Sequence, residues 1–214
     1  MKLFFVYWLA SMLAVAAPIN GPVKVTLINT GDGTSDGRDF IGPYTLQIDA
    51  KSYPAMCIDF LDDTAVGASW TADFTDLSSK NFSGTYLGNG NNTVKIYDEE
   101  ADLFAMLLDT TNAMQRTNIQ HAAWYLTDHA YSLNSGAKQE LKLAEDTYDS
   151  KAFQKTVDDY EIVSDVDMGA GQAQEFIIRI ATPEPRSLAL IGAGLLLITW
   201  LLRKVLLKKE IARR

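Results

Sequence analysis

The 214-residue chain carries 27 acidic and 19 basic side chains, for a net charge of −8, and 47% of its residues are hydrophobic. Residues 17–182 hold 25 of the acidic and 11 of the basic side chains, a balance of −14. A segment this acidic excludes nucleic-acid binding through phosphates. Its length suits one domain with a sizeable core, and its acidity suits solubility or the attraction of cations and basic partners.

The N-terminus has the layout of a secretory signal peptide. Lys2 gives a short basic start, and an apolar run follows, "LFFVYWLASMLAVAA". The run ends in small residues, Ala14-Val15-Ala16, which are typical of a cleavage site. We therefore expect residues 1–16 to be removed after Ala16 and the protein to be exported through the secretory pathway. The alternative is an N-terminal membrane anchor, for which the run is short.

The first half of the exported segment predicts β-structure. Residues Val23 to Asn29, "VKVTLIN", alternate in polarity as a strand does. Three more short β-rich runs follow at 44–50, 53–60 and 67–77, separated by turn residues. Alternation in the second of these runs would make Asp59 point the same way as Cys57.

The second half predicts helices and then a return to strands. Residues 98–110 have apolar side chains at helical spacing. A second helix is expected from Asn112, as N-cap, to about Asp128, with Gln115 in the capping-box position. A third covers residues 135–148, and strands are expected at 159–166 and 174–180. Residues 17–182 are therefore predicted to form an α+β domain, a β-sheet or barrel with a helical insertion.

Metal binding has weak support. The Gly-rich loop "DGTSDGRD" contains Asp32, Asp36 and Asp39, but Pro43 stands where an EF-hand needs a glutamate. A calcium site and a solvated loop both remain open. The two histidines, His121 and His129, lack the further ligands of a metal motif, and His121 is expected to face solvent. We expect no metal or other cofactor.

The C-terminal residues 183–214 have three parts. A turn, Pro183-Glu184-Pro185, precedes an apolar run from Leu188 to Leu202 and a basic tail. The run is about 22 Å long as a helix, and snorkelling of the following basic side chains extends the expected membrane span to Leu188–Leu207. The basic tail predicts a transmembrane helix with a cytoplasmic C-terminus and with the preceding domain outside.

These three parts, in this order, resemble a PEP-CTERM sorting signal. The resemblance implies an exosortase-type sorting protease as a partner, which would cut near Pro183, Glu184 and Pro185 and remove the anchor. It also implies a final location at the cell surface or in extracellular polymer.

Cys57, in "MCIDF", is the only cysteine of the chain. In an exported protein it has no internal disulfide partner, so it is an intermolecular partner, a reactive thiol or a small buried hydrophobe. In "IQHAAW", Gln120 and Trp124 share a helix face, and the small residue Ala122 lets another backbone approach. A cysteine thiolate held against a glutamine carboxamide, away from water, can expel ammonia and leave a thioester.

The two motifs resemble those of the thioester domains of bacterial surface adhesins, over roughly Tyr44 to Asp128. The resemblance implies Cys57 and Gln120 as the bonded pair and Asp59, Ala122 and Trp124 as supporting residues. Three neighbours depart from the family pattern, which has an aromatic residue, a threonine and a branched aliphatic residue there: Met56, Ile119 and Ala123.

The resemblance implies a covalent adhesin or cross-linker. An amine on a partner surface or matrix protein would attack the thioester once, so the protein would not be an enzyme. The alternative is a non-covalent structural or extracellular-matrix protein in which the same scaffold keeps Cys57 and Gln120 unlinked.

Overall fold

The computed structural model describes residues 19–31, 33–129, 131–148, 157–167 and 172–180. The predicted signal peptide of residues 1–16, the Pro183-Glu184-Pro185 turn and the expected membrane span 188–207 lie outside these described residues. Within the described part of the chain, no helix is long and apolar enough to cross a membrane.

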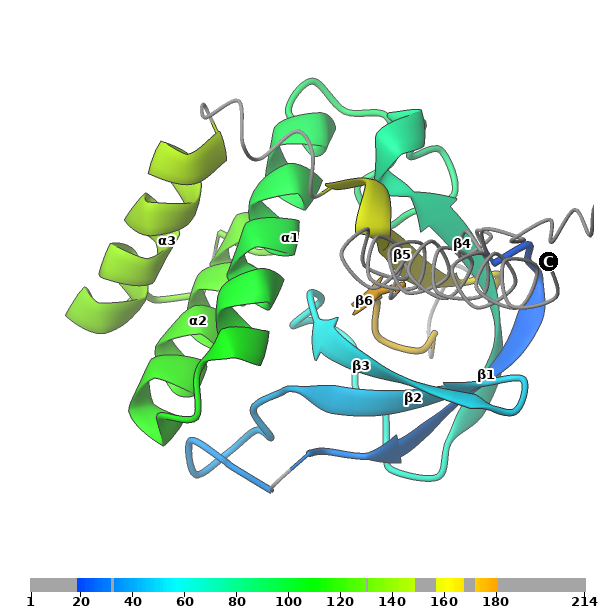
Figure 1. The fold of residues 1–214 in the computed structure, drawn as a ribbon, viewed down its shortest axis with the longest axis horizontal. Coiled ribbons are helices and arrows are strands. Elements are labelled where there is room, and N and C mark those ends of the chain that lie inside the picture. The colour runs from blue at the N-terminus through cyan, green and yellow to red at the C-terminus, as the bar shows by residue number, and fades with distance from the viewer. Residues whose placement is uncertain (1–18, 32, 130, 149–156, 168–171, 181–214) are drawn as a thin grey trace, which may run out of the picture. The chain divides into compact units, whose positions relative to one another are not determined.

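Six antiparallel strands close into a barrel in the order β1-β2-β3-β6-β5-β4 (Figure 1). The strands are β1 (Val23–Asn29), β2 (Tyr44–Ile48), β3 (Lys51–Cys57), β4 (Ser69–Asp76), β5 (Tyr160–Asp165) and β6 (Phe176–Arg179). The sequence predicts a strand in each of these places. Closure removes the exposed edges that an open sheet would have.

Three helices are inserted between β4 and β5: α1 (Thr93–Asp109), α2 (Ala113–Thr127) and α3 (Ser135–Tyr148). Two short 3₁₀ turns, η1 (Leu77–Ser79) and η3 (Val157–Asp159), flank the insertion. Figure 1 shows the helices grouped on one side of the barrel, with α1 next to the strands and α3 farther out. The predicted α+β domain with a helical insertion is therefore confirmed.

The helix ends agree with the sequence in part. The side chain of Asn112 accepts a hydrogen bond from the backbone N–H of Gln115 at 3.1 Å, so the predicted N-cap of α2 is confirmed. The Gln115 side chain instead accepts from the hydroxyl of Thr110. Helix α1 begins at Thr93, one turn and more before the predicted start, because buried Tyr97 extends its apolar face towards the N-terminus.

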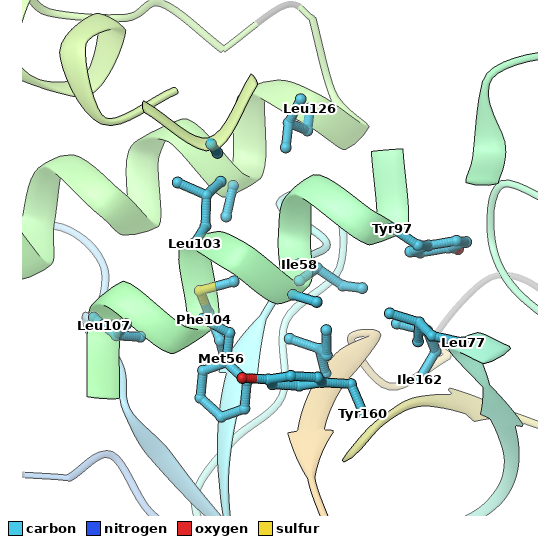
Figure 2. Close-up of a cluster of buried hydrophobic side chains, with 14 of the residues drawn as sticks. Met56, Ile58, Leu77, Tyr97, Leu103, Phe104, Leu107, Leu126, Tyr160 and Ile162 are labelled. Atoms are coloured by element: carbon cyan, nitrogen blue, oxygen red, sulfur yellow. The ribbon is translucent and has the colours of Figure 1, made fainter. Parts of the chain in front are cut away.

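The core has two parts that meet at β3. Ala55 and Cys57 belong to the cluster inside the barrel, whereas Met56 and Ile58 belong to the cluster between barrel and helices. Figure 2 shows this second cluster, in which side chains of the helices pack against those of the strands. Full burial of each large side chain stabilises the fold by about 1.5–3 kcal/mol. Cys57 therefore lies at the strand end where both core layers converge.

Candidate functional site around Cys57 and Gln120

The fold brings Cys57 and Gln120 together across 63 residues of sequence. Cys57 is the last residue of β3, Gln120 lies in the middle of α2, and both are 0% exposed. The Gln120 amide Nε2 donates a hydrogen bond of 2.5 Å to the backbone carbonyl of Cys57. The carboxamide and the cysteine are thus neighbours in an interior that excludes water.

The Cys57 thiol is held in its neutral form. Its Sγ donates a hydrogen bond to the backbone carbonyl of Asp59 at 3.0 Å. Burial raises the pKa of the thiol to about 12, and the nearby carboxyls of Asp59 and Glu100 add to the effect. The indole of Trp124 opposes this rise in pKa, although its Nε1 falls short of a geometric hydrogen bond to any described residue. Attack by the sulfur therefore requires that the thiol first lose its proton.

The Gln120 carboxamide is tightly enclosed and held at one end only. Its Oε1 is buried and has no hydrogen-bond partner among the described residues. A Cβ added at Gly42 would lie 3.3 Å from this oxygen and 3.2 Å from side-chain carbons of Leu107 and Tyr44. Gly42 therefore lets the loop before β2 close over the carboxamide, a role that its Gly-Pro dipeptide alone does not indicate.

Asp59 lies beside Cys57 and Gln120, but among the described residues no hydrogen bond joins its carboxylate to the Cys57 thiol. Strand β3 ends at Cys57, so the predicted alternation of side chains does not extend to Asp59. The backbone carbonyl of Asp59, and not its side chain, accepts the hydrogen bond from the Cys57 Sγ. One carboxylate oxygen accepts from the Leu61 N–H at 2.9 Å, and the other is buried without a described partner. Burial, with a further contribution from Asp62, raises the pKa of Asp59 to about 6 against the opposing Leu61 hydrogen bond.

The other supporting residues cover the pair. Ala122 is fully buried, and its small side chain belongs to the core layer between helices and barrel. Trp124 belongs instead to the barrel cluster that holds Cys57. Its ring lies 5.1 Å from that of Phe60 and 5.6 Å from that of Tyr131, centroid to centroid. These three rings form an aromatic cover that packs against the barrel cluster.

His121 does not face solvent, contrary to the sequence expectation. Its side chain is 12% exposed, and its Nε2 lies 2.9 Å from a carboxylate oxygen of Asp36. The imidazole also stacks at 5.7 Å on Trp124. The expectation was wrong because the loop 33–41 folds over this turn of α2, which a single helix pattern cannot reveal.

The Gly-rich loop that contains Asp36 and Asp39 is held by hydrogen bonds to other groups of the protein. Burial tends to raise the pKa of Asp36, but the backbone N–H groups of Asp39 and Arg38 and the imidazole of His121 lower it below its ordinary value. Asp32 lies outside the described residues. Among the residues that are described, no group of three or more His, Cys, Asp or Glu side chains is arranged to hold a metal ion.

The sequence analysis missed a second tie between α2 and β3. The Thr127 hydroxyl donates a hydrogen bond of 2.5 Å to the backbone carbonyl of Ile58, the residue after Cys57. Thr127 follows Gln120 and Trp124 at helical spacing, so the face they share was a usable signal. Gln120 and Thr127 together hold the end of β3 against α2.

Two buried carboxyl groups lie in the same region. Glu175 accepts hydrogen bonds from the hydroxyls of Ser164 and Tyr97 and from the N–H of Tyr86, and burial raises its pKa to about 7. Glu100 is 0% exposed, and neither of its carboxylate oxygens has a described partner. Burial, with the charges of Glu99 and Glu175 nearby, raises the pKa of Glu100 well above the ordinary value and so favours its neutral form. No sequence pattern distinguished these two from the other acids.

The residues around Cys57 and Gln120 thus combine a neutral buried thiol, an enclosed carboxamide and an aromatic cover. No protein-family model, curated protein or solved structure matches the chain. The geometry of this site is therefore what supports a function.

Proposed function

We propose that the chain is an exported surface protein whose domain forms a thioester between Cys57 and Gln120. An amine on a partner protein attacks the thioester, and the two proteins become joined by an amide bond. The protein reacts once and does not turn over. The observation that supports this proposal is the contact of the fully buried Gln120 amide with the backbone of the fully buried Cys57, at 2.5 Å.

The chemistry balances without a cofactor. The Cys57 thiol loses its proton, its sulfur attacks the Gln120 carboxamide carbon, and the amide nitrogen leaves as ammonia with the proton. The partner amine later attacks the same carbon, the carbon–sulfur bond breaks, and the amine's proton returns to the Cys57 sulfur. Close approach and exclusion of water are the two conditions for the first step, and the burial of both residues supports them.

The same contact also favours the second candidate function. In an unlinked pair, the intact Gln120 amide bridges α2 to β3 by its hydrogen bond to Cys57. Cys57 would then be a buried apolar side chain, and the protein would serve as a non-covalent structural or matrix module. The two functions differ in one chemical property, the presence of an electrophilic carbonyl at Gln120.

Methylamine labelling distinguishes the two functions. The purified protein is incubated with methylamine, digested and mapped by mass spectrometry, beside a Cys57→Ala variant. A thioester incorporates methylamine at Gln120 and releases an alkylatable Cys57 thiol. The proposal fails if Gln120 is unmodified in the wild type or is modified equally in the Cys57→Ala variant.

The proposed location rests on the two ends of the chain. The signal peptide of residues 1–16 would direct export, and the Leu188–Leu207 helix would anchor the protein with its C-terminus in the cytoplasm. An exosortase-type protease would then cut near Pro183-Glu184-Pro185 and release the domain to the surface or matrix. Replacing Pro183, Glu184 and Pro185 by alanine should leave the protein in the membrane fraction; release at the wild-type level would refute this step.

A further inference from the structure

A pocket of about 470 Å³ lies where β4 ends and β5 begins. These two strands are neighbours in the barrel (Figure 1). The volume falls within the range of small-ligand sites. The described residues that line the pocket do not include Cys57, Gln120 or the rings that cover them, so the pocket is separate from the proposed thioester site.

Acidic side chains line this pocket without a basic one. Asp73, Asp76 and Glu161 contribute to its wall, and among the described lining residues there is no lysine, arginine or histidine. Asp76 and Glu161 are register partners in the pairing of β4 with β5, so their side chains start from the same level of neighbouring strands. Asp73 forms no ion pair with any described residue. The described wall therefore carries an unbalanced negative charge, which favours a cation.

The buried side chain of Glu161 is a second, independent sign of a ligand. Glu161 is 2% exposed, and its Oε1 accepts a hydrogen bond of 3.1 Å from the Ile19 N–H. Its Oε2 is buried and has no hydrogen-bond partner among the described residues. Such an oxygen is costly to bury, and a donor that enters the pocket would supply the missing partner.

The charge state of Glu161 agrees with a missing cation. Burial raises the pKa of this carboxyl to about 7 against the opposing hydrogen bond from Ile19, and the charge of Asp76 adds to the rise. A positive group beside a carboxylate has the reverse effect, because it favours the charged form. A bound cation would therefore stabilise Glu161 in its ionised form.

The other groups of the pocket favour a planar organic cation. Among the described residues the acidic side chains are not arranged to hold a metal ion. Phe74 lines the pocket and offers an apolar surface, and Asn81 adds a polar amide. A guanidinium has five N–H donors in one plane, stacks on aromatic rings and is more weakly hydrated than an ammonium. It can therefore donate to more than one carboxylate while it packs against a ring.

We propose that this pocket binds the guanidinium group of an arginine. The Oε2 of Glu161 and a carboxylate oxygen of Asp76 would accept its N–H donors, and Phe74 would pack against its plane. The Oδ1 of Asp76 already accepts the Ser78 N–H at 2.7 Å, so the second oxygen is the one offered to the ligand. Asp73, at the exposed side of the pocket, would add attraction for the positive charge.

This inference does not depend on a thioester. It gives the domain a second, non-covalent binding site for either an arginine of a partner protein or the free amino acid. Both sources present the same guanidinium, and the probes of the test distinguish them.

The test compares two probes that differ in charge but hardly in shape. They are N-acetyl-arginine methylamide and N-acetyl-citrulline methylamide, in which a neutral urea group replaces the guanidinium. Their affinities for the full-length Cys57→Ala variant, which has no thioester to react, are measured by ligand-observed nuclear magnetic resonance about one pH unit above the pKa of Glu161. The arginine probe should bind about tenfold more tightly, a difference of about 1.4 kcal/mol. Equal affinities, or no binding of either probe, would overturn the inference.

Charge variants in the same background locate the binding. Glu161→Gln retains an acceptor for the Ile19 N–H and should remove most of the preference for the arginine probe. Asp63→Asn, in the exposed loop between β3 and β4 and outside this pocket, is the matched control and should keep the preference. Asp73→Asn, at an exposed position, serves if Glu161→Gln does not fold, and should weaken the arginine probe severalfold. An unchanged preference in the folded variant of the pocket would refute the assignment.

Two further probes identify the source and the chemical group. Tighter binding of the blocked arginine than of free arginine supports an arginine within a partner chain, and the reverse order supports the free amino acid. N-acetyl-lysine methylamide should bind more weakly than the arginine probe; equal affinity would overturn the assignment to a guanidinium. Failure of the wild type to label with methylamine would refute the proposed function and leave this binding result intact.

Discussion

At the scale of single residues, the two ends of the Gln120 carboxamide differ. Nε2 donates to Cys57, whereas Oε1 is buried without a described partner. Such an oxygen costs about 1–3 kcal/mol of folding free energy. Unsatisfied buried groups of this kind concentrate where function requires them. Conversion of the amide to a thioester keeps this carbonyl oxygen in the site and removes only the nitrogen.

Gly42 should be required for the closure of this site. In Gly42→Ala the new methyl group would meet Gln120, Leu107 and Tyr44 at 3.2–3.3 Å, which is tighter than ordinary contact. We expect the free energy of unfolding to fall by about 1–3 kcal/mol, measured by urea denaturation. Gly84→Ala is the matched control, because nothing lies within 4 Å of an added Cβ there. Equal losses in the two variants would contradict the enclosure of the carboxamide.

At the scale of elements, α2 is the helix that carries the site, and two side chains tie it to the end of β3. Gln120 bonds to the carbonyl of Cys57, and Thr127 bonds to that of Ile58. Because the two contacts are on successive residues, the last residue of β3 and the one after it, they fix both the height and the rotation of the helix. The position of Gln120 relative to Cys57 therefore depends on Thr127.

Thr127→Val tests this dependence with little change of shape. Loss of the hydrogen bond to the buried Ile58 carbonyl should lower the free energy of unfolding by about 1–3 kcal/mol. Thr117→Val is the control, since the Thr117 hydroxyl donates to the carbonyl of Ala113 within α2, in a hydrogen bond that is exposed to solvent. The free energy of unfolding of the two variants is measured by calorimetry. If Thr127→Val lowers it no more than Thr117→Val does, the hydrogen bond from Thr127 to Ile58 is unimportant for stability.

The sequence predicted most elements because their signals are local. Polarity alternation located β1, and helical spacing located α3, both with the bounds that the structure has. The first helix was predicted too short, since its opening turn follows the Asn-Gly turn signal and lacks a side-chain cap. The environment of His121 depends on a loop 85 residues away, at Asp36, and such long-range contacts leave no local pattern.

At the scale of the whole molecule, buried acids should make stability depend on pH. Burial raises the pKa of both Glu161 and Glu175 from 4.5 to about 7. Between these values the folded state holds more protons on these two groups than the unfolded state, so the stability they contribute is greatest below about pH 4.5 and is lost as pH rises through about 7. Urea denaturation across this window should show the decline.

Glu161→Gln should make that decline shallower. The amide oxygen can still accept the hydrogen bond of the Ile19 N–H, and the titrating group is gone. Asp49→Asn, an exposed acid on the β2–β3 hairpin, is the control and should leave the slope unchanged. Stability that increases with pH over this range in the wild type would contradict the account of these buried carboxyls.

The barrel, the insertion and the residue types of the site followed from sequence patterns, but their assembly did not. Closure of the barrel needs β1 to pair with β4 and β3 with β6, and no local signal specifies those pairs. The contact of Cys57 with Gln120 followed only from a resemblance. Gly42, Glu100 and the pocket around Glu161 depend on packing between distant segments and had no sequence signal of their own.

The central claim is a covalent bond, and mass reports it most directly. The intact mass of the purified wild-type protein is compared with that of a Cys57→Ala variant prepared in the same way, so that any processing of the ends is shared. A thioester predicts that the wild type is lighter than its sequence mass by one ammonia and that the variant is not. If both proteins have their full sequence mass and Cys57 is alkylated after unfolding, the pair is unlinked and the covalent function is contradicted.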